Sequence, residues 1–189
     1  MCGICGELSL RNAVVDAAAL QAMTATIPHR GPDHGATYRA DEGHAGLGFR
    51  RLSIIDLRAT ANQPIGNEDG SVHLVFNGEI YNYRDLRPGL VSRGHQFRSE
   101  SDSEVIVHLY EELGDRAIDE LDGMFALAIW DTRERTLTIA RDRFGMKPIY
   151  VSRVAGGVAF ASEVGALRRA GLTDGVVNPA GVLAFLAWG

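Results

Sequence analysis

The chain has 189 residues, of which 46% are hydrophobic and 23% are charged, proportions typical of one folded domain. A net charge of −5 and the lack of any basic run argue against a nucleic-acid partner. No apolar stretch approaches the roughly 18 residues of a membrane span, and no secretory signal is recognisable. Because the two cysteines are too few for a disulfide framework, we expect a cytoplasmic protein.

Apolar periodicity and turn residues predict the elements of the first half of the chain. In chain order they are a strand at 3–10, a helix from Asp16 to Ile27 with Asp16 as its cap, a loop at 29–33, a strand at 44–55, a loop through 62–64 and a short strand at 72–76. The last strand ends in Asn77-Gly78, a dipeptide typical of hairpin turns.

The second half combines helices with two hairpins. The expected elements are a helix from Asn82 to Leu90 that Pro88 shortens or bends, a helix behind the capping box Ser101–Glu104 that ends at Gly114, helical turns at 116–121, hairpins at 123–130/136–141 and 147–152/158–162, a helix at 163–170, and a last helix capped by Asn178 that stops at Gly189. Strands cluster at both ends of the chain, which indicates an α+β fold of two sheets with helices outside. The run at 123–130 is apolar on both faces and should be buried.

Cys2 is the first candidate for chemistry. If Met1 is removed, one residue carries a thiol nucleophile and an α-amine whose pKa of about 7.7–8.0 suits a base at neutral pH. Cys2 and Cys5 could instead form half of a zinc site, completed by His29 and His34, or a redox pair. Only two cysteines are present and the pair does not follow a strand, so we expect no metal ligand and assign Cys5 to the core.

Nine motifs carry a resemblance to a known family. They are MCGICG at 1–6, HRGPD at 29–33, RRLSIID at 50–56, QP at 63–64, FNGEIYNY at 76–83, SDSEV at 101–105, DGMFALAIWD at 122–131, ARDRFGMKPIY at 140–150 and FASE at 160–163. In this order they resemble the glutaminase domain of glutamine-dependent asparagine synthetases, a class II glutamine amidotransferase of the N-terminal-nucleophile type. The resemblance covers residues 1–189, which we expect to form one such domain.

The resemblance implies a fold and a set of site residues. The fold would be a four-layer αββα sandwich, in which Cys2 attacks the side-chain amide of L-glutamine. It implies that Arg51 binds the α-carboxylate of glutamine and that Glu79 and Asp102 bind its α-ammonium. The Asn77 side chain and the Gly78 N–H would form the oxyanion hole. Residues between Arg51 and Ile54, including Ser53, would add backbone contacts.

These residue types suit a zwitterionic substrate independently of the resemblance. The planar guanidinium of arginine can form two parallel hydrogen bonds with a carboxylate, and carboxylates pair with an ammonium. Hydrogen-bond donors that point at the reacting oxygen stabilise a tetrahedral oxyanion. Taken singly, each has a plainer explanation: Arg51 as a solvated strand residue, Asp102 as a helix cap and Asn77-Gly78 as a hairpin. We expect His29 to serve loop packing and residues 141–143 to brace a turn or a domain contact.

The chain departs from the family at Phe49 and Cys5, neither of which belongs to the implied site. The synthetase half with its SGGxDS pyrophosphate loop does not occur in this sequence, so we expect no cofactor here and assign ATP and Mg²⁺ to a C-terminal synthetase domain that begins after residue 189. The expected partners are L-glutamine and that domain, with homodimerisation left open. The alternatives are a sister amidotransferase that amidates another acid, or a silent interaction module that retains Met1.

Overall fold

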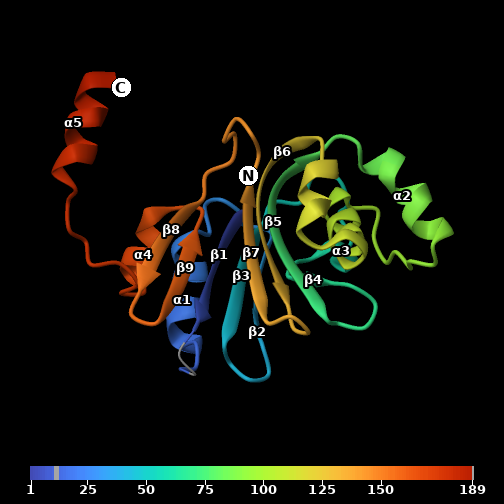
Figure 1. The fold of residues 1–189 in the computed structure, drawn as a ribbon, viewed down its shortest axis with the longest axis horizontal. Helices are drawn as coiled ribbons and strands as arrows, with labels where there is room; N and C mark the ends of the chain where they lie inside the picture. Colours follow the sequence, from blue (N-terminus) through green and yellow to red (C-terminus); the bar gives the residue numbers. More distant parts are fainter. Residues whose placement is uncertain (11–12, 189) are drawn as a thin grey trace.

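Two antiparallel sheets lie face to face in the computed structural model, which describes residues 1–10 and 13–188 (Figure 1). The first sheet has the order β2-β3-β1-β9-β8 and the second the order β4-β5-β6-β7. The strands of the first sheet are β1 (Gly3–Ser9), β2 (His34–Arg39), β3 (Ala45–Arg51), β8 (Tyr150–Val154) and β9 (Gly157–Ala161). Those of the second are β4 (Ile65–Gly66), β5 (Val72–Ile80), β6 (Gly123–Asp131) and β7 (Thr136–Arg141).

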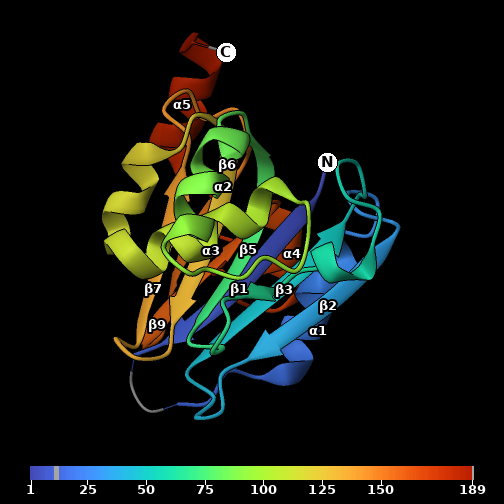
Figure 2. The same cartoon turned by 90° about the vertical axis from the view of Figure 1, so that its right-hand side faces the viewer.

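Helices cover the outer face of each sheet. The first sheet carries α1 (Ala17–Thr26) and α4 (Val164–Arg169); the second carries α2 (Tyr83–Ser92) and α3 (Asp102–Leu113), which Figure 2 shows in front of β5. Two short 3₁₀ helices are η1 (Ala59–Ala61) and η2 (Gly114–Glu120). The predicted four-layer αββα sandwich is therefore confirmed. In the described part of the chain, no helix is both long and apolar enough to cross a membrane.

The last helix, α5 (Pro179–Trp188), stands away from the sandwich with its side chains exposed (Figure 1). Its predicted cap is confirmed, because Ala180 N donates to Asn178 Oδ1 at 3.0 Å. The predicted stop at Gly189 lies outside the described residues.

The core has one hydrophobic cluster for each interface between layers. Along β6, Ala126, Ala128 and Trp130 enter the cluster between the sheets, and Phe125 and Leu127 enter the cluster beneath α3. The two-residue alternation of a strand produces this division. The prediction that β6 is buried on both faces is confirmed.

The predicted hairpin at Asn77-Gly78 is wrong. β5 runs through the dipeptide to Ile80 and pairs with β6 along its whole length, with Gly78 opposite Phe125. A Cβ added at Gly78 would collide with the carbonyl oxygen of Met124. Glycine is required here for the close approach of two strands and not for a turn.

Other expectations need smaller corrections. β2 and β4 were not predicted, and β3 ends at Arg51, short of the predicted residue 55. The capping box is half right: Ser101 Oγ accepts from Ser103 N at 3.3 Å, but the Glu104 carboxylate binds the backbone N–H groups of residues 98 and 99. Asn82 precedes α2 without capping it, since its side chain bonds residues 120 and 122.

The layered core predicts a contrast between two phenylalanines. Phe160 is 0% exposed between the sheets, whereas Phe144 is 86% exposed. We expect Phe160→Ala to lower the free energy of unfolding by about 3–5 kcal/mol, and Phe144→Ala to change it by less than about 0.5 kcal/mol. Urea denaturation followed by circular dichroism measures both, and equal losses would contradict the assignment of the core.

Candidate active site

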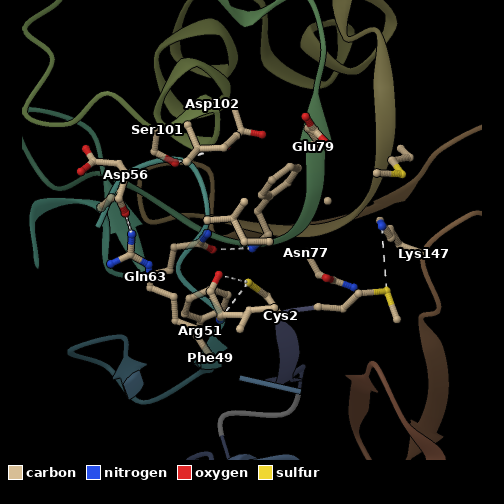
Figure 3. Close-up of a pocket in the computed structure, with 18 residues that line it drawn as sticks. Cys2, Phe49, Arg51, Asp56, Gln63, Asn77, Glu79, Ser101, Asp102 and Lys147 are labelled. Atoms are coloured by element: carbon tan, nitrogen blue, oxygen red, sulfur yellow. Dashed lines mark hydrogen bonds between the residues drawn. The ribbon is translucent and has the colours of Figure 1, made fainter. Parts of the chain in front are cut away.

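A solvent-open cavity of about 740 Å³ lies where the ends of β1, β3 and β5 meet the start of α3 (Figure 3). Seven of the eight predicted site residues line it, all except Ser53: Cys2, Arg51, Ile54, Asn77, Gly78, Glu79 and Asp102. Cys2 and Asp102, 100 positions apart in the sequence, thus share one cavity.

Cys2 lies at the base of this cavity, beside the backbone of Leu52. Leu52 N donates to Cys2 Sγ at 3.4 Å, and the thiol lies 3.6 Å from Leu52 O as a donor. Burial raises the pKa of the Cys2 thiol above its ordinary value, although the Leu52 N–H and the nearby terminal ammonium oppose the change. At neutral pH the thiol is therefore protonated and needs a base before it can attack.

The backbone of Cys2 is held by the HRGPD and FASE motifs. Arg30 Nε donates to the carbonyl oxygen of Cys2 at 3.0 Å, and Glu163 accepts from Arg30 Nη1 at 3.2 Å and from His29 Nε2 at 2.8 Å. An added Cβ at Gly31 would collide with the backbone of Arg50, so only glycine lets this loop lie against β3. The His29 side chain is 59% exposed and does not line the cavity, so it binds Glu163 at the surface instead of packing the loop as expected.

Asn77 and Gly78 offer two hydrogen-bond donors to the cavity. Asn77 Nδ2 is buried and has no hydrogen-bond partner among the described residues. Gly78 N lies on the same edge of β5 as Phe76 N and Ile80 N, which donate to Gln63 Oε1 and Asp102 Oδ2. Phe125, opposite Gly78, uses its own N and O on Asp142 instead. The Gly78 N–H therefore points away from β6.

Arg51 lines the cavity, but most of its donors already hold the loop at 52–62. Nη1 donates to Arg58 O at 3.0 Å and to Asn62 Oδ1 at 2.7 Å, and Nη2 donates to Asp56 O (Figure 3). A guanidinium has five N–H groups, so two remain for a ligand, one on Nη2 and one on Nε. Arg51 is both a loop anchor and a buried positive charge at this cavity.

Two carboxylates, Glu79 and Asp102, lie on the α3 side of the cavity (Figure 3). Glu79 shares the inner face of β5 with Asn77 by strand alternation. Asp102 begins α3, is 5% exposed, and accepts from Ile80 N at 2.9 Å through Oδ2. Burial raises the pKa of Asp102, and the charge of Glu79 adds to the rise. A bound cation between them would reverse this effect.

The structure does not bring Ser53 to the cavity. Its backbone N–H donates to Asp33 Oδ2 at 2.7 Å, so it ties the HRGPD loop to the segment after β3. The zinc and redox alternatives for the cysteines also fail on geometry: Cys2 packs toward the space between the sheets, whereas Cys5 is buried under α1 against Thr24.

Comparison with known proteins identifies the family. The model of a glutamine amidotransferase domain matches residues 1–189. The chain belongs to this family. It is 44% identical to Bacillus subtilis (strain 168) asparagine synthetase [glutamine-hydrolyzing] 2 over 170 residues, covering 88% of this chain and 22% of that protein. It is 43% identical to Arabidopsis thaliana asparagine synthetase [glutamine-hydrolyzing] 2, covering 88% of this chain and 28% of that protein. The chain thus spans about a quarter of the length of these relatives.

Solved structures support the fold of this glutamine amidotransferase domain. The Bacillus subtilis glutamine phosphoribosylpyrophosphate amidotransferase complexed with ADP and GMP matches with a TM-score of 0.75 at 21% identity, over 90% of this chain and 44% of that one. A structure described as the allosteric regulatory enzyme of purine biosynthesis matches with a TM-score of 0.72 over the same shares. These matches confirm the predicted α+β fold of two antiparallel sheets between helices.

The amidotransferase domain also places residues in the cavity that the sequence analysis did not assign. They are Lys147, Gln63, Ser101 and Met124 among others. Lys147 follows the turn at 142–146, where the Asp142 carboxylate accepts from the N–H groups of residues 144 and 146 at 3.0 Å. Asp142 and Arg141, which donates to Gly145 O, therefore have the turn-bracing role expected of residues 141–143. The motifs at 63–64 and 140–150 contain Gln63 and Lys147, but only the folded turn shows that Lys147 lines the cavity.

The environment of Cys2 predicts the pH profile of its alkylation. In chains that retain Met1, the raised pKa of the thiol leaves less thiolate at a given pH, so labelling by iodoacetamide should reach half its maximal rate above the pH of about 8.5 typical of a free cysteine. Mass spectrometry separates these chains and locates the label. Cys5, whose pKa burial raises to about 12, should stay unlabelled while the protein is folded. A half-maximal labelling rate of Cys2 at or below the pH of a free cysteine would contradict the raised pKa of its thiol.

Proposed function

We propose that this domain hydrolyses L-glutamine to glutamate and ammonia, with Cys2 as the nucleophile. The observation that carries the proposal is the buried Asn77 Nδ2, which has no hydrogen-bond partner among residues 1–10 and 13–188 and lies in the cavity that Cys2 lines. A buried donor without an acceptor costs free energy, roughly 1–3 kcal/mol. It is retained in folds where a ligand supplies the acceptor, and a tetrahedral oxyanion is such an acceptor.

The reaction requires removal of Met1, which lines the cavity here and packs its Sδ atom 3.9 Å from Lys147 Nζ. After removal, the α-amine of Cys2 takes the thiol proton, directly or through a water molecule, and the sulfur attacks the amide carbon. The oxyanion rests on Asn77 Nδ2 and Gly78 N. The ammonium of Cys2 protonates the leaving nitrogen, ammonia departs, and water hydrolyses the γ-glutamyl thioester to release glutamate and the thiol.

The charges of the cavity suit a free amino acid. The remaining N–H groups of Arg51 would bind the α-carboxylate, and Glu79 and Asp102 would bind the α-ammonium. With one cation and two anions around the cavity, a substrate that lacks the α-carboxylate or the α-ammonium would leave a buried charge unpaired. Such substrates should therefore bind poorly. Ile54 contributes to the cavity wall.

The use of the ammonia follows from the relatives. We propose that it amidates aspartate to asparagine in a C-terminal synthetase unit that uses ATP and Mg²⁺, since relatives about 44% and 43% identical are named glutamine-hydrolysing asparagine synthetases. The exposed apolar face of α5 is compatible with such a neighbour. We place the protein in a reducing compartment, the cytoplasm, because the reaction needs a free thiol.

Substitution of the nucleophile tests the function. We expect purified chain without Met1 to release glutamate and ammonia from L-glutamine, and Cys2→Ala to abolish the release. Cys5→Ala is the matched control and should retain activity, because Cys5 is buried outside the cavity. Intact-mass spectrometry reports Met1 in each sample. Wild-type activity in Cys2→Ala, or none in wild type lacking Met1, would overturn the proposal; complete retention of Met1 would favour an interaction module.

Removal of the unpartnered donor tests the oxyanion site. Asn77→Ala should lower kcat for glutamine hydrolysis by about 10²–10³-fold, the effect of deleting one oxyanion-hole donor. Asn178→Ala, at the exposed start of α5, is the matched control and should leave kcat unchanged. Steady-state glutamate release measures both variants. A loss below about tenfold in Asn77→Ala would show that its Nδ2 does not bind the oxyanion.

A further inference from the structure

A second polar cluster lies away from the cavity, on the outer side of the second sheet. Glu68 comes from the loop between β4 and β5, His95 from the segment after α2, and His108 and Glu111 from α3. One nitrogen or oxygen of each side chain lies within 4.8 Å of those of the other three. None of the four residues lines the cavity that contains Cys2. Spacing by three residues places His108 and Glu111 on one face of α3.

His108 is buried without the hydrogen bonds that a buried imidazole normally makes. Its side chain is 1% exposed, and neither ring nitrogen has a hydrogen-bond partner in the part of the chain that the structure describes. Nδ1 lies 3.2 Å from Glu68 Oε2, but the direction is not that of a hydrogen bond. Glu111 Oε2, also buried, is likewise unpartnered there. A nitrogen and an oxygen therefore face the same cluster with their lone pairs unsatisfied.

His95 shows how the cluster could accept a cation. Its Nε2 lies 3.1 Å from Glu112 Oε1, and because a carboxylate only accepts, Nε2 carries the proton. Its Nδ1 lies 3.3 Å from Glu68 Oε1 and 3.8 Å from Glu111 Oε2. In a neutral imidazole that Nδ1 is a lone pair facing two carboxylates, an arrangement that needs either a second proton or a metal ion. Carboxylate support of the far nitrogen is the usual outer shell of a metal-bound histidine.

The donor atoms are gathered closely enough to surround a small cation. Zinc with ligands at about 2.0–2.2 Å separates neighbouring donor atoms by roughly 3.3–3.6 Å. Both oxygens of Glu68 lie near that separation from an imidazole nitrogen, Oε2 at 3.2 Å from His108 Nδ1 and Oε1 at 3.3 Å from His95 Nδ1. Glu111 Oε2 lies 3.8 Å from His95 Nδ1, and the donor atoms of all four residues lie within 4.8 Å of one another, so modest side-chain adjustment would bring them around one ion. Two imidazole nitrogens with two carboxylate oxygens favour zinc over magnesium or calcium, which prefer oxygen ligands. Glu68 and Glu111 side chains are 30% and 26% exposed, so an ion can enter from solvent.

We propose that Glu68, His95, His108 and Glu111 form a zinc site. The ion would join the β4–β5 loop, the segment after α2 and the middle of α3, and it would supply the missing partner of His108. Because α3 begins at Asp102, a bound ion would also restrain the helix that carries this cavity residue. The sequence pattern predicted no metal ligand because the four residues come from three separate segments and include neither cysteine.

Zinc binding is best measured in a Cys2→Ala background, because a terminal thiol and amine can bind zinc themselves. We expect the chelator-treated protein to bind one zinc ion per chain in competition with a chelating dye, and to develop the visible absorption of tetrahedral Co²⁺ when cobalt replaces zinc. Added zinc should also raise the melting temperature, because an ion that binds only the folded state stabilises it.

Two variants and one control test the ligands. His95→Asn and Glu111→Gln, both in partly exposed side chains, should each weaken zinc binding by at least about tenfold, the scale found even for outer-shell changes. His44→Asn is the matched control: His44 pairs with Glu42 alone at 3.6 Å and should have no effect. Circular dichroism confirms folding of each variant. No zinc binding by the parent, or equal affinity in parent, His95→Asn and Glu111→Gln, would overturn the site and show a protonated imidazole network instead.

Discussion

The geometry of the candidate active site depends on the hydrogen bonding of β1. The ends of a chain usually fray, but Cys2 directly precedes a strand that lies inside its sheet. β1 pairs with β3 on one side and with β9 on the other. Ile4 is bound twice by Ser162, whose N donates to Ile4 O at 2.8 Å and whose Oγ accepts from Ile4 N at 3.0 Å. Arg30 also donates to the carbonyl oxygen of Cys2, so the backbone of the second residue is fixed by hydrogen bonds like that of a residue inside the sheet.

The opposite wall of the cavity is ordered by Asp56. The side chain of Arg58 holds the pKa of Asp56 well below its ordinary range, with help from the N–H groups of Glu100 and Arg58. Asp56 therefore stays ionised and links the loop after β3 to the segment before α3. Its carbonyl binds Arg51. Asp56 thus positions both Arg51 and the segment that leads to Asp102 before any ligand binds. Because these groups are already ordered, less conformational entropy is lost on binding.

Local signals predicted most of the fold. Strands with continuous or alternating apolar residues, such as β6, and helices with a polar cap, such as α1 behind Asp16, were found close to their observed bounds. β2 and β4 were missed because β2 is half exposed and carries few apolar residues, and β4 has two residues. Gly78 was misread because a glycine needed for close strand packing has the same local sequence as a turn.

The sequence alone determined the chemistry available at the cavity: a cysteine behind the initiator, an arginine, two carboxylates and an Asn-Gly pair in an order that a family shares. The tertiary structure alone decided that Asn77 Nδ2 has no hydrogen-bond partner within the described residues, that the Ser53 N–H donates to Asp33, and that His108 lies beside Glu68. The physical reason is that residue type follows from the sequence directly, whereas hydrogen-bond satisfaction depends on partners tens of residues away. Those partners are chosen by the packing of the two sheets and their helices.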